Sequence, residues 1–190
     1  MDTNLNGKKI AILATDGFEQ IELEEPRHAL DEAGALTVVV APKGGKIEGY
    51  KHFDRGQPIE VDAQLDDVKA EDFDALVLPG GALNPDQLRM SPKAVQFVQN
   101  IAKEGKPIAA ICHGPWTLVE ADVVRGRTLT SWPSLKTDLR NAGANWVDKE
   151  VVVDGQFVTS RKPDDIPAFN REMLALFASS SGGKLQGKAA

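Results

Sequence analysis

The chain contains a single cysteine, Cys112, and its neighbours are typical of a catalytic nucleophile. It directly follows the apolar run 107–111, and Ala110 and Gly114 lie two residues before and two residues after it. A nucleophile elbow is a sharp strand-to-helix turn, and it requires small residues at these positions because their backbones nearly touch. A helix beginning near Pro115 would point its N-terminal amides at the sulfur and favour the thiolate. The alternative is an inert cysteine of the core, but the turn context favours a nucleophile.

A second candidate group is the Pro-Gly-Gly turn at 79–81, which also follows an apolar run. Glycines let backbone N–H groups approach a bound oxygen, so Gly81 could form one side of an oxyanion hole, with the amide of His113 as the other donor. A plain turn is the alternative, and the nucleotide-binding patterns G-x-x-x-x-G-K-[ST] and G-x-G-x-x-G are absent. The sequence leaves open whether the imidazole of His113 reaches the sulfur. His28 and His52 are assigned to surface or packing positions.

Four glutamates lie at the start of the first expected helix: Glu19, Glu22, Glu24 and Glu25. Acids at a helix N-terminus complement its dipole without any function, and Glu19 fits a capping box with Asp16. Glu22 differs, because Pro26 cannot donate a hydrogen bond to its carbonyl and a kink is expected there. We therefore expect Glu22 to enter a crevice beside Cys112 and the last two glutamates to face water. A charged carboxylate there would oppose a thiolate, whereas a protonated one could donate a hydrogen bond to it.

The elements that must position these residues alternate between short apolar strands and helices. We expect strands at 8–13, 36–41, 74–78, 107–111 and 127–130, and helices at 17–33, 91–104, 115–121, 134–142 and 164–178. Residues 42–72 predict turns with one hairpin, and Asp154-Gly155 between 150–153 and 156–159 predicts a second hairpin. This order predicts an α/β fold with a mostly parallel sheet and helices on both faces. Ligands bind beyond the carboxyl ends of such strands, where the features above lie.

Length, composition and charge limit the class of protein. The chain has 190 residues, of which 42% are hydrophobic and 26% charged, and its net charge is −6. These values predict a single domain over 1–190 with a disordered tail at 179–190. The acidic balance argues against nucleic acid as a partner, and no apolar run approaches the ~20 residues of a membrane-spanning helix. One cysteine excludes an internal disulfide and a multi-cysteine zinc site. We expect a cytoplasmic protein without metal or cofactor.

Together these motifs resemble the ThiJ/PfpI superfamily, in particular its PfpI-like intracellular protease and general stress protein branch. The resemblance covers about 8–177 and rests on several separated motifs: Phe18-Glu19-Gln20-Ile21-Glu22-Leu23, Pro79-Gly80-Gly81, Asn84-Pro85-Asp86, Ala110-Ile111-Cys112-His113-Gly114-Pro115, Asn141-Ala142-Gly143-Ala144 and Val153-Asp154-Gly155. It implies a flavodoxin-like three-layer sandwich of the class I glutamine amidotransferase-like type. It also implies a homodimer or a higher homo-oligomer.

The resemblance assigns roles to individual residues. Cys112 matches the elbow cysteine of the family, Glu22 its partner glutamate, and His113 the adjacent histidine of the peptidase-type members. In those members an acid from the neighbouring subunit completes a triad. Asp86 occupies that place here, with a shorter side chain than the Glu of the archaeal enzymes and one extra residue in the loop.

These residues predict a cysteine hydrolase, and the resemblance implies a role in the stress response. The Cys112 thiolate would attack a carbonyl carbon, Glu22 would shuttle the proton, and the amides of Gly81 and His113 would hold the oxyanion. The resemblance implies small carbonyl compounds, glycated adducts or peptides as substrates, and thus a deglycase, a glyoxalase or a peptidase-like activity. The alternative is a redox-sensing or protective stress protein in which Cys112 is oxidised and turnover is negligible.

Overall fold

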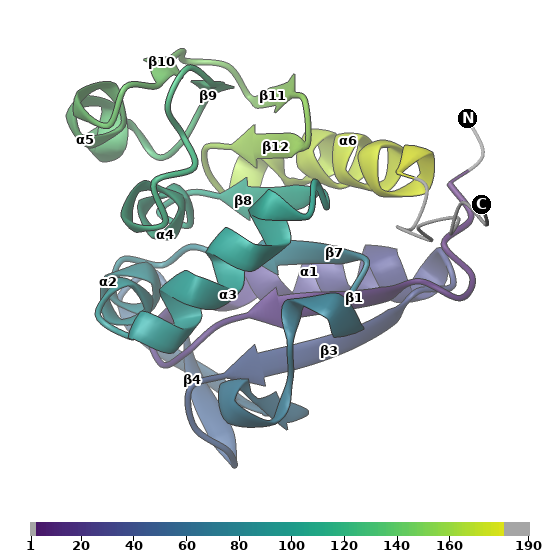
Figure 1. Ribbon diagram of the computed structural model, residues 1–190. Coiled ribbons are helices and arrows are strands. Elements are labelled where there is room, and N and C mark those ends of the chain that lie inside the picture. The colour runs from purple at the N-terminus through teal and green to yellow at the C-terminus, as the bar shows by residue number, and fades with distance from the viewer. Residues whose placement is uncertain (1–2, 181–190) are drawn as a thin grey trace, which may run out of the picture.

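A seven-stranded sheet forms the middle of the molecule (Figure 1). A computed structural model describes residues 3–180 of the chain. The strand order is β11-β12-β8-β7-β1-β3-β6, and all neighbours are parallel except β11 and β12. The strands are β1 (Lys9–Leu13), β3 (Leu36–Ala41), β6 (Ala63–Gln64), β7 (Ala75–Leu78), β8 (Ile108–Ile111), β11 (Val151–Asp154) and β12 (Phe157–Ser160). The expected mostly parallel sheet is confirmed, as is the hairpin around Asp154-Gly155.

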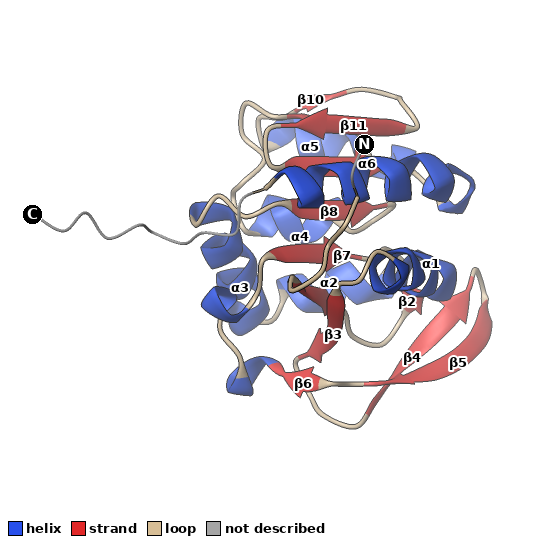
Figure 2. Ribbon diagram, turned by 90° about the vertical axis from the view of Figure 1, so that its right-hand side faces the viewer, coloured by secondary structure: helices blue, strands red, loops and turns tan. Residues whose placement is uncertain are grey.

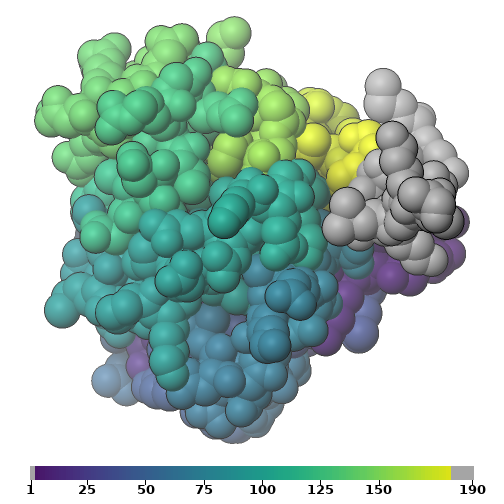
Figure 3. Space-filling view, in the orientation of Figure 1, coloured from purple at the N-terminus to yellow at the C-terminus, as the bar shows by residue number. Residues whose placement is uncertain are grey.

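Helices cover both faces of this sheet and complete a three-layer sandwich (Figures 1 and 2). One face carries α1 (Gln20–Glu32) and α6 (Ile166–Ser179), and the other carries α2 (Leu83–Arg89), α3 (Pro92–Lys103), α4 (Pro115–Glu120) and α5 (Lys136–Asn141). The teal surface of α3 covers the middle of the second face in Figure 3. Between residues 3 and 180, four short 3₁₀ helices link the elements: η1 (Leu65–Asp67), η2 (Ala70–Asp72), η3 (Pro133–Leu135) and η4 (Pro163–Asp165).

The central strands are apolar throughout because each supplies both cores. In β7, Leu76 and Leu78 enter the core under α2–α5, while Ala75 and Val77 enter the core under α1 and α6. This alternation follows from the two-residue period of a strand, and a parallel sheet covered on both faces requires it. The carboxyl ends of β7 and β8, where the candidate residues begin, are therefore anchored in both cores.

Two small sheets flank the main one. Strands β9 (Thr128–Leu129) and β10 (Asn145–Trp146) pair in parallel beside α5. The second small sheet joins β2 (Phe18–Glu19) to a hairpin of β4 (Lys46–Lys51) and β5 (Asp54–Glu60). This hairpin projects from the body of the molecule (Figure 2). The hairpin expected within 42–72 is therefore confirmed.

Three local predictions need correction. Asp16 does not cap the first helix: its carboxylate pairs with Lys43 Nζ at 2.6 Å, and the chain passes through β2 before α1 begins at Gln20. Helix α2 was not expected, because its first turn contains Asn84-Pro85, a typical loop pair. Ser179 belongs to α6 rather than to a disordered tail, and Ser180 follows it with its Oγ donating to the Phe177 carbonyl at 2.8 Å. The rest of that predicted tail, 181–190, lies outside the described residues.

Candidate active site

Cys112 lies on a strained turn at the carboxyl end of β8. Its φ is +60°, a left-handed conformation that residues other than glycine rarely adopt. The turn is held by a hydrogen bond from the Gly114 N–H to the Ile111 carbonyl at 2.9 Å, and the Cys112 N–H donates to the Ser160 carbonyl at 3.1 Å. A Cβ on Gly114 would lie 2.9 Å from the Ile111 oxygen, closer than side-chain carbons approach. The tight elbow predicted from the small neighbours of Cys112 is therefore present.

Glu22 lies beside Cys112, as the sequence predicted, and its side chain is 0% exposed. Glu24 and Glu25, on the same helix, are exposed. The Oε2 atom of Glu22 accepts a hydrogen bond from the Gly80 N–H at 2.9 Å, and Oε1 has no partner of good hydrogen-bond geometry. Burial raises the pKa of this carboxyl to about 8, against the lowering effect of the Cys112 thiol and of nearby backbone N–H groups. At neutral pH the carboxyl is therefore mostly protonated.

Gly80 makes this contact possible. A Cβ at this position would lie 2.6 Å from the Cβ of Cys112 and 2.9 Å from the His113 nitrogen, and it would overlap the Glu22 carboxyl. Sequence reasoning had singled out the neighbouring Gly81, which adopts φ +78°. Both glycines are needed at this turn: Gly80 gives space, and Gly81 gives the backbone conformation.

The protonation state expected for Cys112 is wrong. The sequence predicted a stabilised thiolate, but the pKa of this thiol is raised, first by burial and then by the neighbouring Glu22 carboxyl. Only 7% of the residue is exposed, and α4 has only six residues with which to oppose the loss of solvation. The N–H groups of Gly81 and His113 interact with the sulfur and lower its pKa by a smaller amount. The resting group is therefore the thiol.

The imidazole of His113 reaches the sulfur, which the sequence had left open. Its Nδ1 lies 3.3 Å from Cys112 Sγ, and its Nε2 lies 3.5 Å from Ser134 Oγ. The ring stacks on Trp132 and meets Trp116 edge-on, with centroid separations of 6.0 and 5.4 Å. Burial lowers the pKa of His113, so the ring is neutral at physiological pH. Sequence reasoning missed Trp116, Trp132 and Ser134, although the last two follow the strand predicted at 127–130.

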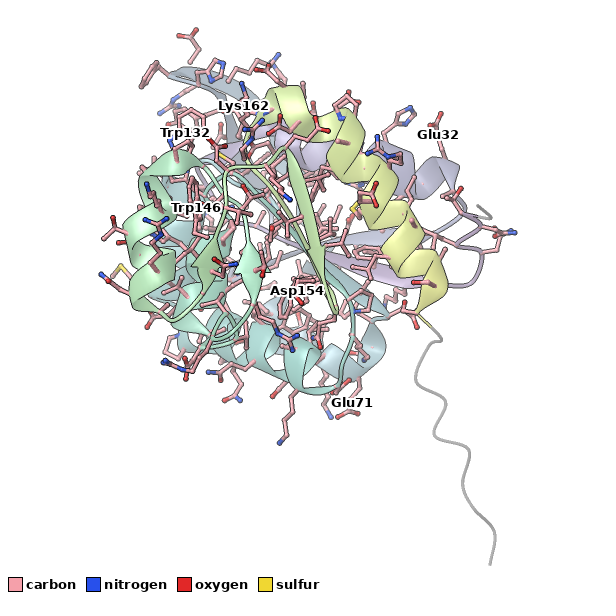
Figure 4. All side chains as sticks on the ribbon, turned by 90° about the horizontal axis from the view of Figure 1, so that it is seen from above. Glu32, Glu71, Trp132, Trp146, Asp154 and Lys162 are labelled. Atoms are coloured by element: carbon pink, nitrogen blue, oxygen red, sulfur yellow. The ribbon has the colours of Figure 1, made fainter. Side chains whose placement is uncertain are left out.

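A pocket of about 350 Å³ opens onto these three side chains. Its outer wall comes from the β4–β5 hairpin and from loops on the other side, through Tyr50, His52, Phe53, Leu83, Trp132 and Pro163. Figure 4 places Trp132 at the end of the molecule from which the hairpin projects. No Lys or Arg within residues 3–180 lines this pocket. The walls are therefore largely apolar, with the reactive groups at the base.

Of Asp86, His28 and His52, His52 alone lines the pocket, on its outer wall. Asp86 is exposed on α2 and does not line the pocket of its own subunit. His28 is exposed, and its Nε2 lies 3.3 Å from Glu32 Oε1. His52 is exposed at the hairpin tip, where its backbone N–H donates to Glu19 Oε2 at 3.0 Å. Over 3–180 no cluster of three or more His, Cys, Asp or Glu side chains could hold a metal ion, and no helix there has the length and apolarity of a membrane span.

Comparison with known proteins places this geometry in a family. The model of the DJ-1/PfpI family matches residues 8–176. The chain belongs to the DJ-1/PfpI family. This DJ-1/PfpI protein is 51% identical to one curated relative, general stress protein 18 of Bacillus subtilis. The match extends over 172 residues, which are 90% of this chain and 98% of the relative. It is 46% identical to protein/nucleic acid deglycase 2 of Escherichia coli over 170 residues, 89% of this chain and 97% of that protein.

Solved structures agree with this assignment. Drosophila melanogaster DJ-1beta superimposes with a TM-score of 0.81 at 31% identity, over 91% of each chain. The resemblance inferred from the separated sequence motifs is thus confirmed, and so is the three-layer fold that it implied.

Proposed function

We propose that this DJ-1/PfpI protein is a stress-response cysteine hydrolase that acts on small carbonyl compounds or glycated adducts, with Cys112 as the nucleophile. The observation that carries the proposal is the grouping of Cys112, Glu22 and His113 at the base of one pocket. The names of the relatives, among them a general stress protein and a deglycase, support the same reading. A peptide would be a substrate only if its reacting segment fits into this pocket of about 350 Å³.

The two titratable neighbours of the sulfur suit opposite roles. Neutral His113 accepts the thiol proton on Nδ1, which is 3.3 Å from the sulfur. The sulfur then forms a bond to the carbonyl carbon of the substrate, and the π electrons of that carbonyl move to its oxygen. Protonated Glu22 donates its proton to this oxygen, and the N–H groups of Gly81 and His113 stabilise the negative charge as it develops. The product of this step is a covalent hemithioacetal.

The sequence analysis gave proton transfer to Glu22, whereas this mechanism divides it between His113 as the base and Glu22 as the acid. A carboxyl with a pKa of about 8 is a poor base at neutral pH but a good proton donor. A neutral imidazole can accept a proton at the same pH. Pairs of groups whose environments separate their proton affinities are typical of acid–base catalysis.

The substrate class follows from the lining of the pocket. Its walls are apolar and carry no Lys or Arg, so they favour an uncharged carbonyl group over an anionic one. Methylglyoxal and its early adducts with amines and thiols are uncharged at the reacting carbonyl. They are therefore the substrates to test first.

Replacement of the nucleophile is the direct test. We expect Cys112→Ala to reduce turnover of methylglyoxal and of methylglyoxal-treated N-acetyl-lysine by a factor on the order of 1000 or more. His28→Gln, a change at an exposed histidine, serves as the matched control and should retain full activity. Dicarbonyl loss and recovery of free amine would be measured for each variant. Equal rates for wild type and Cys112→Ala would exclude covalent catalysis by this thiol.

A redox role is a second candidate, and one observation favours it. The buried Oε1 of Glu22 has no hydrogen-bond partner of good geometry, so a protonated carboxyl could donate to an oxygen added to the sulfur. Two equivalents of peroxide would convert the thiol first to sulfenic and then to sulfinic acid, with water as the other product. The raised pKa of Cys112 predicts slow oxidation at neutral pH. Intact mass after mild peroxide treatment tests this role, and a chain that gains no oxygen at Cys112 would exclude it.

Assembly and location belong to the same proposal. We expect a cytoplasmic, single-domain protein that forms a homodimer or a higher homo-oligomer. Exposed apolar side chains at Leu36, Leu83 and Val153 support an assembly, because a second subunit would remove them from water. Light scattering during size-exclusion chromatography measures the mass, and a monomer at micromolar concentration would contradict this expectation.

A further inference from the structure

The two ring nitrogens of His113 have different partners within one subunit. Nδ1 faces Cys112 Sγ at 3.3 Å, while Nε2 faces Ser134 Oγ at 3.5 Å. Among the described residues His113 forms no ion pair, so no carboxylate of the same subunit occupies the position of a third triad member. Ser134 takes that position instead.

The backbone that carries Ser134 is attached directly to the nucleophile elbow. The Trp132 N–H donates a hydrogen bond to the Cys112 carbonyl at 2.9 Å, and the Leu135 N–H donates to the Trp132 carbonyl at 3.1 Å. Leu135 is completely buried, which fixes the turn of η3 against the core. The hydroxyl of Ser134 is therefore held in register with the imidazole, even though its side chain is exposed.

Two tryptophans restrict the plane of the ring. Trp132 stacks on the imidazole with an interplanar angle of 24°, and Trp116 meets it at 63°. Trp116 is itself fixed by a hydrogen bond from its Nε1–H to Asp138 Oδ2 at 2.7 Å. Rotation of the ring out of this plane would break the stacking, so the two tryptophans fix the plane in which Nδ1 meets Cys112 and Nε2 meets Ser134.

We propose that Ser134 is a positioning residue, whose hydroxyl oxygen accepts the Nε2–H of His113 and so leaves Nδ1 free to accept the Cys112 proton. In this step the S–H bond breaks and an Nδ1–H bond forms, while the Nε2–H remains in place. The charge of the imidazolium spreads over the ring, and the Ser134 oxygen stabilises it at Nε2. The inference rests on the proposed function for the reaction that it serves, but the tautomer exists without substrate.

The surrounding groups leave this role to Ser134. The other titratable groups of the pocket are Glu19 and Glu22, which precede and begin α1, and Tyr50 and His52 of the hairpin. Glu22 interacts with the sulfur and with Gly80, and Glu19 accepts a backbone N–H at the hairpin tip. Neither carboxylate forms an ion pair with the imidazole within 3–180. The competing partner for Nε2 is an acid such as Asp86 from a neighbouring subunit.

Nitrogen NMR of the intact protein tests the tautomer directly. The chain contains three histidines, so a His113→Gln spectrum assigns the signal in ¹⁵N-labelled protein. Wild type above the pKa of His113 should show protonated Nε2 and bare Nδ1. We expect Ser134→Ala to mix the two tautomers and Ser134→Thr to restore the wild-type spectrum. An unchanged tautomer in Ser134→Ala would overturn the proposal.

Thiol reactivity gives a second readout. We expect Ser134→Ala to slow alkylation of Cys112 by iodoacetamide about three- to tenfold, which corresponds to the loss of one hydrogen bond. Its rate–pH profile should also shift, and Ser134→Thr should recover both. Asp86→Asn is the matched comparison and should change neither the tautomer nor the profile. If Asp86→Asn alone changes them, the neighbouring subunit orients the ring and the proposal is wrong.

These outcomes separate the inference from the proposed function. A Cys112→Ala variant with full turnover would remove the proposed reaction, yet a tautomer that responds to Ser134 would still establish the positioning role. Conversely, a Cys112-dependent reaction with an unresponsive tautomer would retain the function and reject the role of Ser134.

Discussion

The two sides of the Cys112 sulfur differ in their solvation. On one side Glu22 is 0% exposed and packs against Gly80, where no side chain could be added. On the other side His113 lies at the pocket, next to Trp132, and faces a hairpin tip where Phe53 is 98% exposed. We call these the closed side and the open side. Burial makes both titratable groups neutral, yet it makes the carboxyl a proton donor and the imidazole a proton acceptor. One physical effect therefore produces two complementary roles.

The closed side has no free space, and Gly80→Ala should give the largest effect. The new methyl group would lie 2.6 Å from the Cβ of Cys112 and 2.9 Å from the His113 nitrogen. These atoms belong to the elbow itself and cannot move aside, so we expect a loss of stability of about 1–3 kcal/mol and loss of Cys112-dependent activity. Thermal melting and turnover measure both. Gly44→Ala, whose nearest neighbour is the flexible Gln64 side chain at 3.1 Å, is the control. An active Gly80→Ala protein would show that the closed side is not tightly packed.

The charge state of the closed side predicts an intermediate effect, visible in the pH dependence of stability. The pKa of Glu22 is raised from 4.5 to about 8 in the folded chain, so the folded state binds this proton more tightly than the unfolded state. The free energy of unfolding should then fall as pH rises from about 4.5 to about 8. Glu22→Gln keeps an acceptor for the Gly80 N–H and removes this decline.

Denaturant titrations at several pH values across this window measure the difference. Glu25→Gln, on the exposed face of the same helix, should leave the pH dependence unchanged. A wild-type protein and a Glu22→Gln variant with parallel profiles would mean that the buried carboxyl is ionised.

The open side predicts the smallest effect. Phe53 is almost fully exposed, so Phe53→Ala should leave the melting temperature unchanged. Because this side chain lines the pocket, we expect KM for the carbonyl substrate to rise about two- to fivefold with little change in kcat. Met90→Ala, an exposed apolar residue outside the pocket, controls for surface effects. A decrease in kcat equal to the rise in KM would instead place Phe53 in the chemical step.

Local sequence signals predicted the parts of the site that depend on neighbouring residues. Ala110 and Gly114 predicted the elbow at Cys112, because a tight turn constrains positions two residues away. The glutamate pattern predicted that Glu22 would turn inward while Glu24 and Glu25 face water, and the kink expected at Pro26 stays a prediction. The alternation of apolar runs and helices likewise predicted the sheet.

Properties that arise between distant segments could not be predicted in this way. The raised pKa of Cys112 depends on burial and on a carboxyl 90 residues earlier in the chain, and no pattern near the cysteine records either. Helix α2 also escaped prediction, because long-range hydrogen bonds hold its start. The buried amide of Asn84 accepts the Thr15 N–H at 2.8 Å and donates to the Pro79 carbonyl at 3.0 Å.

Strand β2 has only two residues, Phe18 and Glu19, yet it connects the pocket wall to its acid. It pairs with β4 of the hairpin on one side, and at Gln20 it leads into the helix turn that carries Glu22. Gln20 adds a further link, since its Oε1 accepts the Gln57 N–H of β5 at 2.9 Å. Any displacement of the hairpin would therefore be transmitted to the first turn of α1 through both β2 and Gln20. The position of the pocket wall and the alignment of the proton donor are thus mechanically coupled.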